Sequence, residues 1–235
     1  MILRVEDLHV RFGQAEILHG ASLEVGAAPL AVVGRNGMGK TTLCNAIMGL
    51  VPTASGQVTL DGEALTGLPP FRIARRGVAL VPQGRRTFPS LSVDEHLRLV
   101  SQGPRVKWTV ERVYETFPRL AERRRNGGTE LSGGEQQMLA ISRALLMNPR
   151  LIIMDEPSEG LAPVIVDHLI ELLRHLPGEG MGLLLVEQNL RVATAVAETV
   201  AIMAIGQVAA TMPAKTLAND IDLQRRYLGV VAAGH

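Results

Sequence analysis

The chain has little cysteine, almost no net charge and no long apolar run, and each shortage excludes a class of protein. Its one cysteine, Cys44, cannot form a disulfide within the chain, so we expect a reducing compartment. The formal net charge of +1 gives no argument for a nucleic-acid partner. No apolar run reaches the roughly 18 residues that a membrane-spanning helix needs, and the N-terminal segment lacks the apolar core of a signal peptide. We therefore expect a soluble cytosolic protein.

What is present is a balance typical of globular proteins, with 235 residues of which 46% are apolar and 20% charged. Loose alternation over the first 25 residues and again at 57–62 predicts strands of a half-exposed antiparallel sheet. Apolar runs that precede helix-like segments follow at 30–34, 78–82 and 151–156, and a further apolar run lies at 183–186. Strands alternating with helices predict an α/β fold with a parallel sheet covered by helices on both faces.

Four of these apolar runs end in polar residues. Because ligands bind at the carboxyl ends of the strands in open α/β sheets, the four ends are expected to form one site. The alternative is that each polar residue only caps the start of a loop, which is plausible for one strand and strained for four. The polar residues are Arg35 and Asn36, Gln83, Asp155 and Glu156, and Glu187 and Gln188.

The segment "GRNGMGKT" fits the phosphate-binding loop pattern G-x-x-x-x-G-K-[ST]. Glycines let backbone N–H groups turn toward an anion, and the following helix presents its positive end. The pattern assigns Lys40 to the β- and γ-phosphates and the Thr41 hydroxyl to Mg²⁺. The candidate nucleotide-binding residues here are Gly34, Arg35, Asn36, Gly37, Met38, Gly39, Lys40, Thr41 and Thr42.

The segment "LIIMDEP" supplies two carboxylates at the end of an apolar run. Asp155 is placed to bind Mg²⁺, through water, and Glu156 is the candidate for polarising the attacking water, because hydrolysis needs an oriented nucleophile. An apolar run ending in Asp-Glu is a weak signal for such a site when it stands alone and a strong one when it follows a phosphate loop.

In "ELSGGEQQMLAISRAL", Ser132, Gly133 and Gly134 open an amphipathic helix whose start suits an anion. These residues resemble the signature loop of the ATP-binding-cassette (ABC) ATPases, and the resemblance covers essentially the whole chain. In that family two nucleotide-binding domains pair head to tail, so the resemblance implies that this helix start holds the partner's ATP. It also matches Phe12 to the aromatic residue that stacks on adenine; the alternative is a residue of the strand core.

The resemblance implies a P-loop NTPase fold over 1–235, with a mixed or parallel core sheet and an antiparallel β subdomain. It further implies an α-helical subdomain at about 85–147, inserted in the RecA-like core. Gln83 falls in the family's glutamine loop, and with Thr41 and Asp155 it is expected to hold Mg²⁺ beside ATP. Membrane subunits of the family dock near the loop that follows Gln83; the alternative for that loop is an ordinary surface loop.

Segments such as "VYETFPRLAERR", "DEPSEGLAP" and "LLVEQN" resemble the LivF type, the shorter of two ATPase subunits of branched-chain amino acid importers. The resemblance implies ATP-driven uptake of such amino acids at the cytoplasmic face of the inner membrane. It implies integral permease subunits as partners and an extracytoplasmic solute-binding protein as an indirect one. We also expect a second ATPase subunit as a partner, either a longer sister chain or otherwise a second copy of this chain. We expect no nucleic-acid partner.

Gln188 stands where most of these ATPases have a histidine that contacts the γ-phosphate. A glutamine amide donates a hydrogen bond but cannot titrate, so we expect Glu156 to activate water while Gln188 positions phosphate and Lys40 binds it. Gln83 in "VPQGR" also resembles urea and short-chain amide importers, which leaves the solute open. A non-transport ABC ATPase and a nucleic-acid-stimulated ATPase remain as less favoured alternatives.

Overall fold

The computed structural model describes residues 2–102 and 106–228, which form two sheets. The smaller sheet has four strands in the order β2-β1-β4-β5, all antiparallel. On β1 and β2, inward apolar residues are separated by exposed polar ones, as in a sheet with one solvated face. The expected antiparallel sheet is therefore present. Its strands are β1 (Leu3–Phe12), β2 (Ala15–Val25), β4 (Ser55–Leu60) and β5 (Glu63–Ala64).

The larger sheet has six strands in the order β10-β9-β3-β8-β7-β6. All neighbouring pairs are parallel except β10 with β9, so the sheet is mixed, as the resemblance implied. Every residue of β3, β7 and β8 is buried, which explains why these strands are nearly unbroken apolar runs in the sequence. The strands are β3 (Leu30–Val33), β6 (Val78–Val81), β7 (Leu151–Asp155), β8 (Gly182–Glu187), β9 (Thr199–Ala204) and β10 (Gln207–Pro213).

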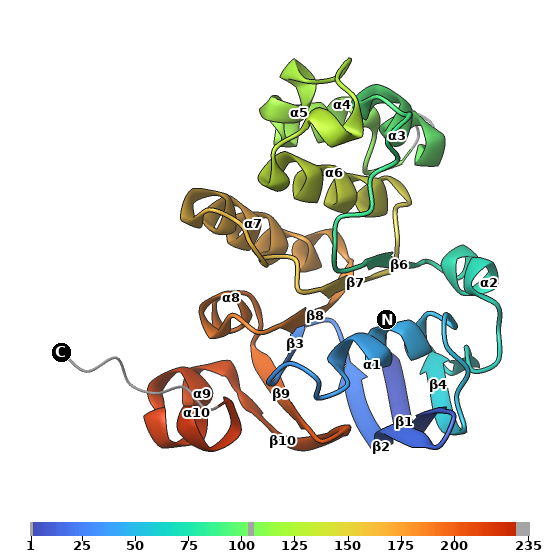
Figure 1. Cartoon of the computed structure of the whole chain (residues 1–235), viewed down its shortest axis with the longest axis vertical. Coiled ribbons are helices and arrows are strands. Elements are labelled where there is room, and N and C mark those ends of the chain that lie inside the picture. Colours follow the sequence, from blue (N-terminus) through green and yellow to red (C-terminus); the bar gives the residue numbers. More distant parts are fainter. Residues whose placement is uncertain (1, 103–105, 229–235) are drawn as a thin grey trace.

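Helices cover the larger sheet on both faces, and β7 shows how the core divides. Ile152 and Met154 pack with α3 to α7 on one face, whereas Leu151 and Ile153 pack with α1 and the antiparallel sheet on the other. A third cluster joins α8, α9 and α10 to β3 and β9. Figure 1 shows α3 to α6 gathered at one end of the molecule beyond α7, and α1 with the antiparallel sheet toward the other.

The helices of the described chain have the following bounds. They are α1 (Lys40–Ile47), α2 (Pro70–Arg75), α3 (Val93–Val100), α4 (Val110–Thr116), α5 (Pro118–Glu122), α6 (Gly133–Leu146), α7 (Pro163–His175), α8 (Leu190–Val196), α9 (Ala214–Asn219) and α10 (Ile221–Leu228), with short 3₁₀ turns η1 (Gly128–Glu130) and η2 (Pro177–Glu179). Of the helices in the two described ranges, none has the length and apolar character needed to cross a bilayer.

The strand order brings the functional loops together. Because β3, β8, β7 and β6 are parallel neighbours, their carboxyl ends lie at one edge of the sheet. The loops that begin at 34, 82, 156 and 188 all start from that edge. The polar strand ends therefore meet, as the sequence predicted.

Candidate active site

The loop between β3 and α1 is shaped by glycine. Gly37 and Gly39 have φ of 79° and 96°, a left-handed conformation that side chains disfavour. At Gly34, a Cβ would lie 2.4 Å from the carbonyl oxygen of Met203, so only glycine fits there. Among the residues that the structure describes, no side chain caps the first turn of α1. The N–H groups at the start of this helix are therefore open to an anion.

Lys40 is buried at the start of α1, and its ammonium group contacts acceptors of the protein itself. Its Nζ donates to the carbonyl oxygens of Gly34 at 2.8 Å and Arg35 at 3.1 Å, and lies 3.2 Å from Oε1 of Glu156. An ammonium has three N–H donors, and three acceptors surround this one. A phosphate that binds here has to replace at least one of them.

Asp155, at the end of β7, has an unsatisfied oxygen. The residue is 2% exposed, and burial raises the pKa of its carboxyl group. The Thr41 side chain opposes this shift in the pKa, but Oδ1 has no donor among the described residues. A buried acceptor without a partner is costly, and a hydroxyl beside a carboxylate is a donor set that Mg²⁺ accepts. These residues therefore fit a magnesium ion.

Glu156 follows β7 with φ of 50°, which is strained for a residue with a side chain. Its N–H donates to the carbonyl oxygen of Val186 at 2.8 Å, which fixes this backbone against β8. The carboxylate lies between Lys40 and Gln83, whose Nε2 donates to Oε2 at 3.2 Å. Strain held in this way at a strand end is typical of functional positions, because it aims a side chain that relaxed backbone would place elsewhere.

A pocket of about 570 Å³ collects most of the candidate residues from four different segments. Phe12 lies on its rim at the end of β1 and is 50% exposed, so the alternative of a buried strand residue is wrong. The volume falls within the range usual for small-molecule sites. The lining residues are Phe12, Ile17, Asn36, Gly37, Gly39, Lys40, Thr41, Thr42, Gln83 and Glu156.

Three candidate residues of the loop do not line this pocket: Gly34, Arg35 and Met38. Met38 packs on the core beneath the antiparallel sheet, where its sulfur accepts from the N–H of Ile205 and its carbonyl oxygen from Gly206. Its side chain therefore faces the protein, and only its backbone can contact a nucleotide. Arg35 is exposed and contributes its carbonyl oxygen to Lys40.

The end of β8 separates two roles. Glu187 is 1% exposed and accepts from the N–H groups of Ser158 at 3.0 Å and Asn189 at 3.2 Å. Burial raises the pKa of its carboxyl group. Glu187 therefore caps loops, as the alternative interpretation of the strand ends allowed for one strand. Gln188 is exposed and borders an adjoining hollow with Glu156.

The signature segment begins α6 at some remove from this pocket. The Ser132 hydroxyl accepts from the N–H of Glu135, and the Glu135 carboxylate accepts from the N–H of Ser132, which closes a capping box. Arg85 lies against Gly133, where a Cβ would be 2.4 Å from its Nη1. Ser132, Gly133 and Gly134 are not among the described residues that line the nucleotide pocket.

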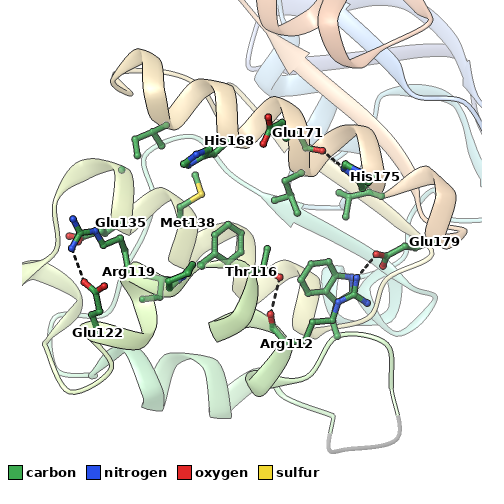
Figure 2. Close-up of a pocket in the computed structure, with 18 residues that line it drawn as sticks. Arg112, Thr116, Arg119, Glu122, Glu135, Met138, His168, Glu171, His175 and Glu179 are labelled. Atoms are coloured by element: carbon green, nitrogen blue, oxygen red, sulfur yellow. Dashed lines mark hydrogen bonds and ion pairs between the residues drawn. The ribbon is translucent and has the colours of Figure 1, made fainter.

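A larger groove of about 670 Å³ lies between α4 to α6 and α7. Figure 2 shows His168 on α7 facing Met138 on α6 across it. At one end Arg112 stacks on Trp108, 4.1 Å from the ring centre, and pairs with Glu179. None of the described lining residues comes from the loop at 34–41, so this groove is separate from the phosphate site.

Two residues that touch the candidate site were not singled out from the sequence. Glu159 accepts from Gln83 Nε2 at 2.9 Å, and Arg85 donates to the Glu159 carbonyl oxygen at 3.5 Å. Both lie within segments that carry the family resemblance, "DEPSEGLAP" and "VPQGR", but nothing in their residue type or spacing marks them individually. Their contacts depend on how the loops after β6 and β7 fold against each other.

A glycine loop after the central strand β3, a buried lysine and two carboxylates at the end of β7, the next strand but one, define a phosphate-loop ATPase. The chain belongs to the ABC transporter family, whose model matches residues 18–159, and the transporter ATPases of this family hydrolyse ATP. A branched-chain amino acid transport ATP-binding protein of Pseudomonas aeruginosa, BraG, is 37% identical over 97% of this chain and 100% of its own length. A probable LivF protein of Archaeoglobus fulgidus is 34% identical over 98% and 100%. The lipopolysaccharide export ATP-binding protein LptB of Haemophilus influenzae is 33% identical over 97% of each chain.

Solved structures agree with the family assignment. The ATP-binding subunit of an ABC transporter superposes with a TM-score of 0.82 and 27% identity, covering 97% of both chains. An ATP-binding cassette in its ADP conformation gives 0.79 and 26%, covering 97% of this chain and 99% of its own. The ABC-type nucleotide-binding fold expected from the sequence is confirmed.

The pairing of Lys40 with Glu156 predicts an effect on stability in the absence of nucleotide. Both side chains are more than nine-tenths buried, so Lys40→Met leaves a buried carboxylate unpaired and should lower the free energy of unfolding by about 3 kcal/mol. The double change Lys40→Met/Glu156→Gln should recover more than half of that loss. Urea denaturation measures both.

The exposed Lys215 offers a matched control. Lys215→Met should change stability by no more than about 0.5 kcal/mol. A double variant that is less stable than Lys40→Met alone would show that the pair does not carry the effect.

Proposed function

We propose that this chain is the ATP-binding subunit of an ABC importer that drives uptake of branched-chain or related amino acids. The family membership supplies the ATPase activity, and similarity to BraG and LivF over the whole chain supports the solute class. The observation that carries the proposed chemistry is the Glu156 carboxylate 3.2 Å from the phosphate-loop lysine, within the pocket.

The roles of the residues follow from their positions. The open N–H groups of α1 and Lys40 bind the β- and γ-phosphates, and Phe12 stacks on adenine at the exposed rim. Thr41, Asp155 and Gln83 would hold Mg²⁺, directly or through water, and the charge that it would supply there is positive charge against the phosphates. Glu156 orients and polarises the attacking water. Gln188 donates a hydrogen bond to a phosphate oxygen without taking a proton.

The site needs a second ATPase domain in this proposal. The start of α6, with Ser132, Gly133 and Gly134, contacts the ATP of a partner domain. The partner is a longer sister subunit or, failing that, a second copy of this chain. Helices α3 to α6 act as the helical subdomain, about 85–147 of the 1–235 ATPase domain.

Integral permease subunits dock near the loop that follows Gln83. Phe88 in that loop is 45% exposed. Its N–H donates to His96 Nε2 at 2.8 Å, and Arg143 lies 5.0 Å from its ring centre. The buried His96 has a lowered pKa because burial disfavours its charged form, so it stays available as an acceptor. The subunit thus sits peripherally at the cytoplasmic face of the membrane, with a solute-binding protein acting indirectly from outside.

Two observations support alternatives. The glutamine at 83 favours a urea or short-chain amide importer, and similarity to LptB favours an export ATPase. Reconstitution with the permease subunits of each transporter type discriminates them. Stimulation of ATP turnover by an amino acid supports the first proposal, stimulation by urea or an amide supports the urea or amide importer, and stimulation by a lipid supports the export ATPase.

Substitution at the two polar strand ends tests the chemistry. Glu156→Gln should reduce ATP turnover about a hundredfold or more, because the general base is lost. Gln188→Ala should reduce it only a few-fold, because one neutral hydrogen bond to phosphate is lost. Phosphate release by the assembled transporter measures both, and equal losses from the two changes would contradict this division of roles.

Light scattering on purified Glu156→Gln tests the second-domain requirement. Because the site is completed by a sister chain, the variant alone should remain monomeric with Mg·ATP at several protein concentrations and form a dimer when the sister subunit is added. An ATP-dependent dimer of this chain alone would replace the heteromeric proposal by a homodimeric one. No assembly under either condition would contradict both.

A further inference from the structure

Glu159 holds the side-chain amide of Gln83. Gln83 Nε2 donates to Glu159 Oε2 at 2.9 Å and to Glu156 Oε2 at 3.2 Å. An amide NH₂ has two hydrogens, and two carboxylate oxygens receive them. The opposite assignment of the amide would place its oxygen against both carboxylates, so the hydrogen-bond network itself fixes the orientation.

This orientation determines what Gln83 can offer a ligand. With both N–H groups directed at carboxylates, the carbonyl oxygen Oε1 points away from them. Gln83 lines the nucleotide pocket together with Lys40, Thr41 and Glu156. An amide oxygen is a ligand that Mg²⁺ accepts, whereas an amide NH₂ is not.

Of the two carboxylates that accept from the Gln83 amide, Glu159 is the one that can keep this contact while the nucleotide is bound. Glu156 also lies 3.2 Å from Lys40 and serves the attacking water in the proposed reaction. Glu159 lies in the exposed loop after β7 and makes the shorter bond to Gln83. Its carbonyl oxygen also accepts from Arg85, so the loop contacts the glutamine loop at two residues, 83 and 85.

We propose that Glu159 is a positioning residue that orients the Gln83 amide so that its oxygen faces the magnesium ion of bound Mg·ATP. The inference rests on the proposed function, which makes Gln83 a metal ligand. Glu159 does not touch the ion; it acts through Gln83. The substitution of its carboxylate therefore weakens the metal-dependent part of nucleotide binding and leaves the metal-free part alone.

The test measures the equilibrium binding of a fluorescent ATP analogue by the whole chain, once with Mg²⁺ and once with EDTA. The dissociation constant in EDTA divided by that in Mg²⁺ reports how much the metal contributes to binding, and no turnover is needed to measure it. Glu159→Ala should reduce that ratio about tenfold, as the loss of a residue supporting a metal ligand does, with the EDTA value unchanged. Glu159→Gln keeps the length and one acceptor oxygen, so it should retain most of the ratio.

Glu115→Ala, at an exposed position on α4, is the matched control and should leave the ratio unchanged. A double-mutant cycle then separates positioning from a general effect. In a Gln83→Ala background, Glu159→Ala should have no further effect on the ratio. An equal loss in both backgrounds, or an unchanged ratio in Glu159→Ala alone, overturns the inference. A wild-type chain that binds no nucleotide in either buffer refutes the proposed function itself.

Discussion

The contact between the Lys40 ammonium and the Glu156 carboxylate is the interaction on which the site depends. Either charge alone would be buried without an opposite charge beside it, at a cost of several kcal/mol. Together they join the loop after β3 to the end of β7, and the carbonyl oxygens of Gly34 and Arg35 complete the lysine's partners. Glu156 reaches Lys40 from a backbone with positive φ, so strain and ion pairing are parts of one arrangement.

The sheet explains why this contact is available. Strand β8 lies between β3 and β7, and its Val186 carbonyl oxygen takes the N–H of Glu156. Strand β8 therefore does more than fill the core, because this hydrogen bond fixes the backbone position from which the Glu156 side chain extends. Glu187, one residue further, fixes the following loop by accepting from Ser158 and Asn189. A buried parallel sheet with loops at one edge thus provides a rigid base for groups that exchange partners when phosphate binds.

Much of this could be predicted from the sequence, because the signals are local. Apolar runs bounded by polar residues predicted the central strands, and the glycine and lysine spacing predicted the phosphate loop. Phe12 was expected at the nucleotide, and the structure places it on the pocket rim. The loop-capping role of Glu187 and the inward side chain of Met38 depend on contacts with segments far away in the chain, so residue type alone could not predict them. The same is true of Glu159, whose partner Gln83 is 76 residues away.

Glu156 competes with phosphate for Lys40. The most direct test is the equilibrium affinity for ATP in EDTA, compared between the wild-type chain and Glu156→Gln by titration calorimetry. Removing the carboxylate releases Lys40 and removes a negative charge near the phosphates, so we expect ATP to bind about tenfold more tightly to the variant than to the wild type. Equal or weaker binding by the variant would contradict it, because Lys40 would then not be exchanged between Glu156 and the nucleotide.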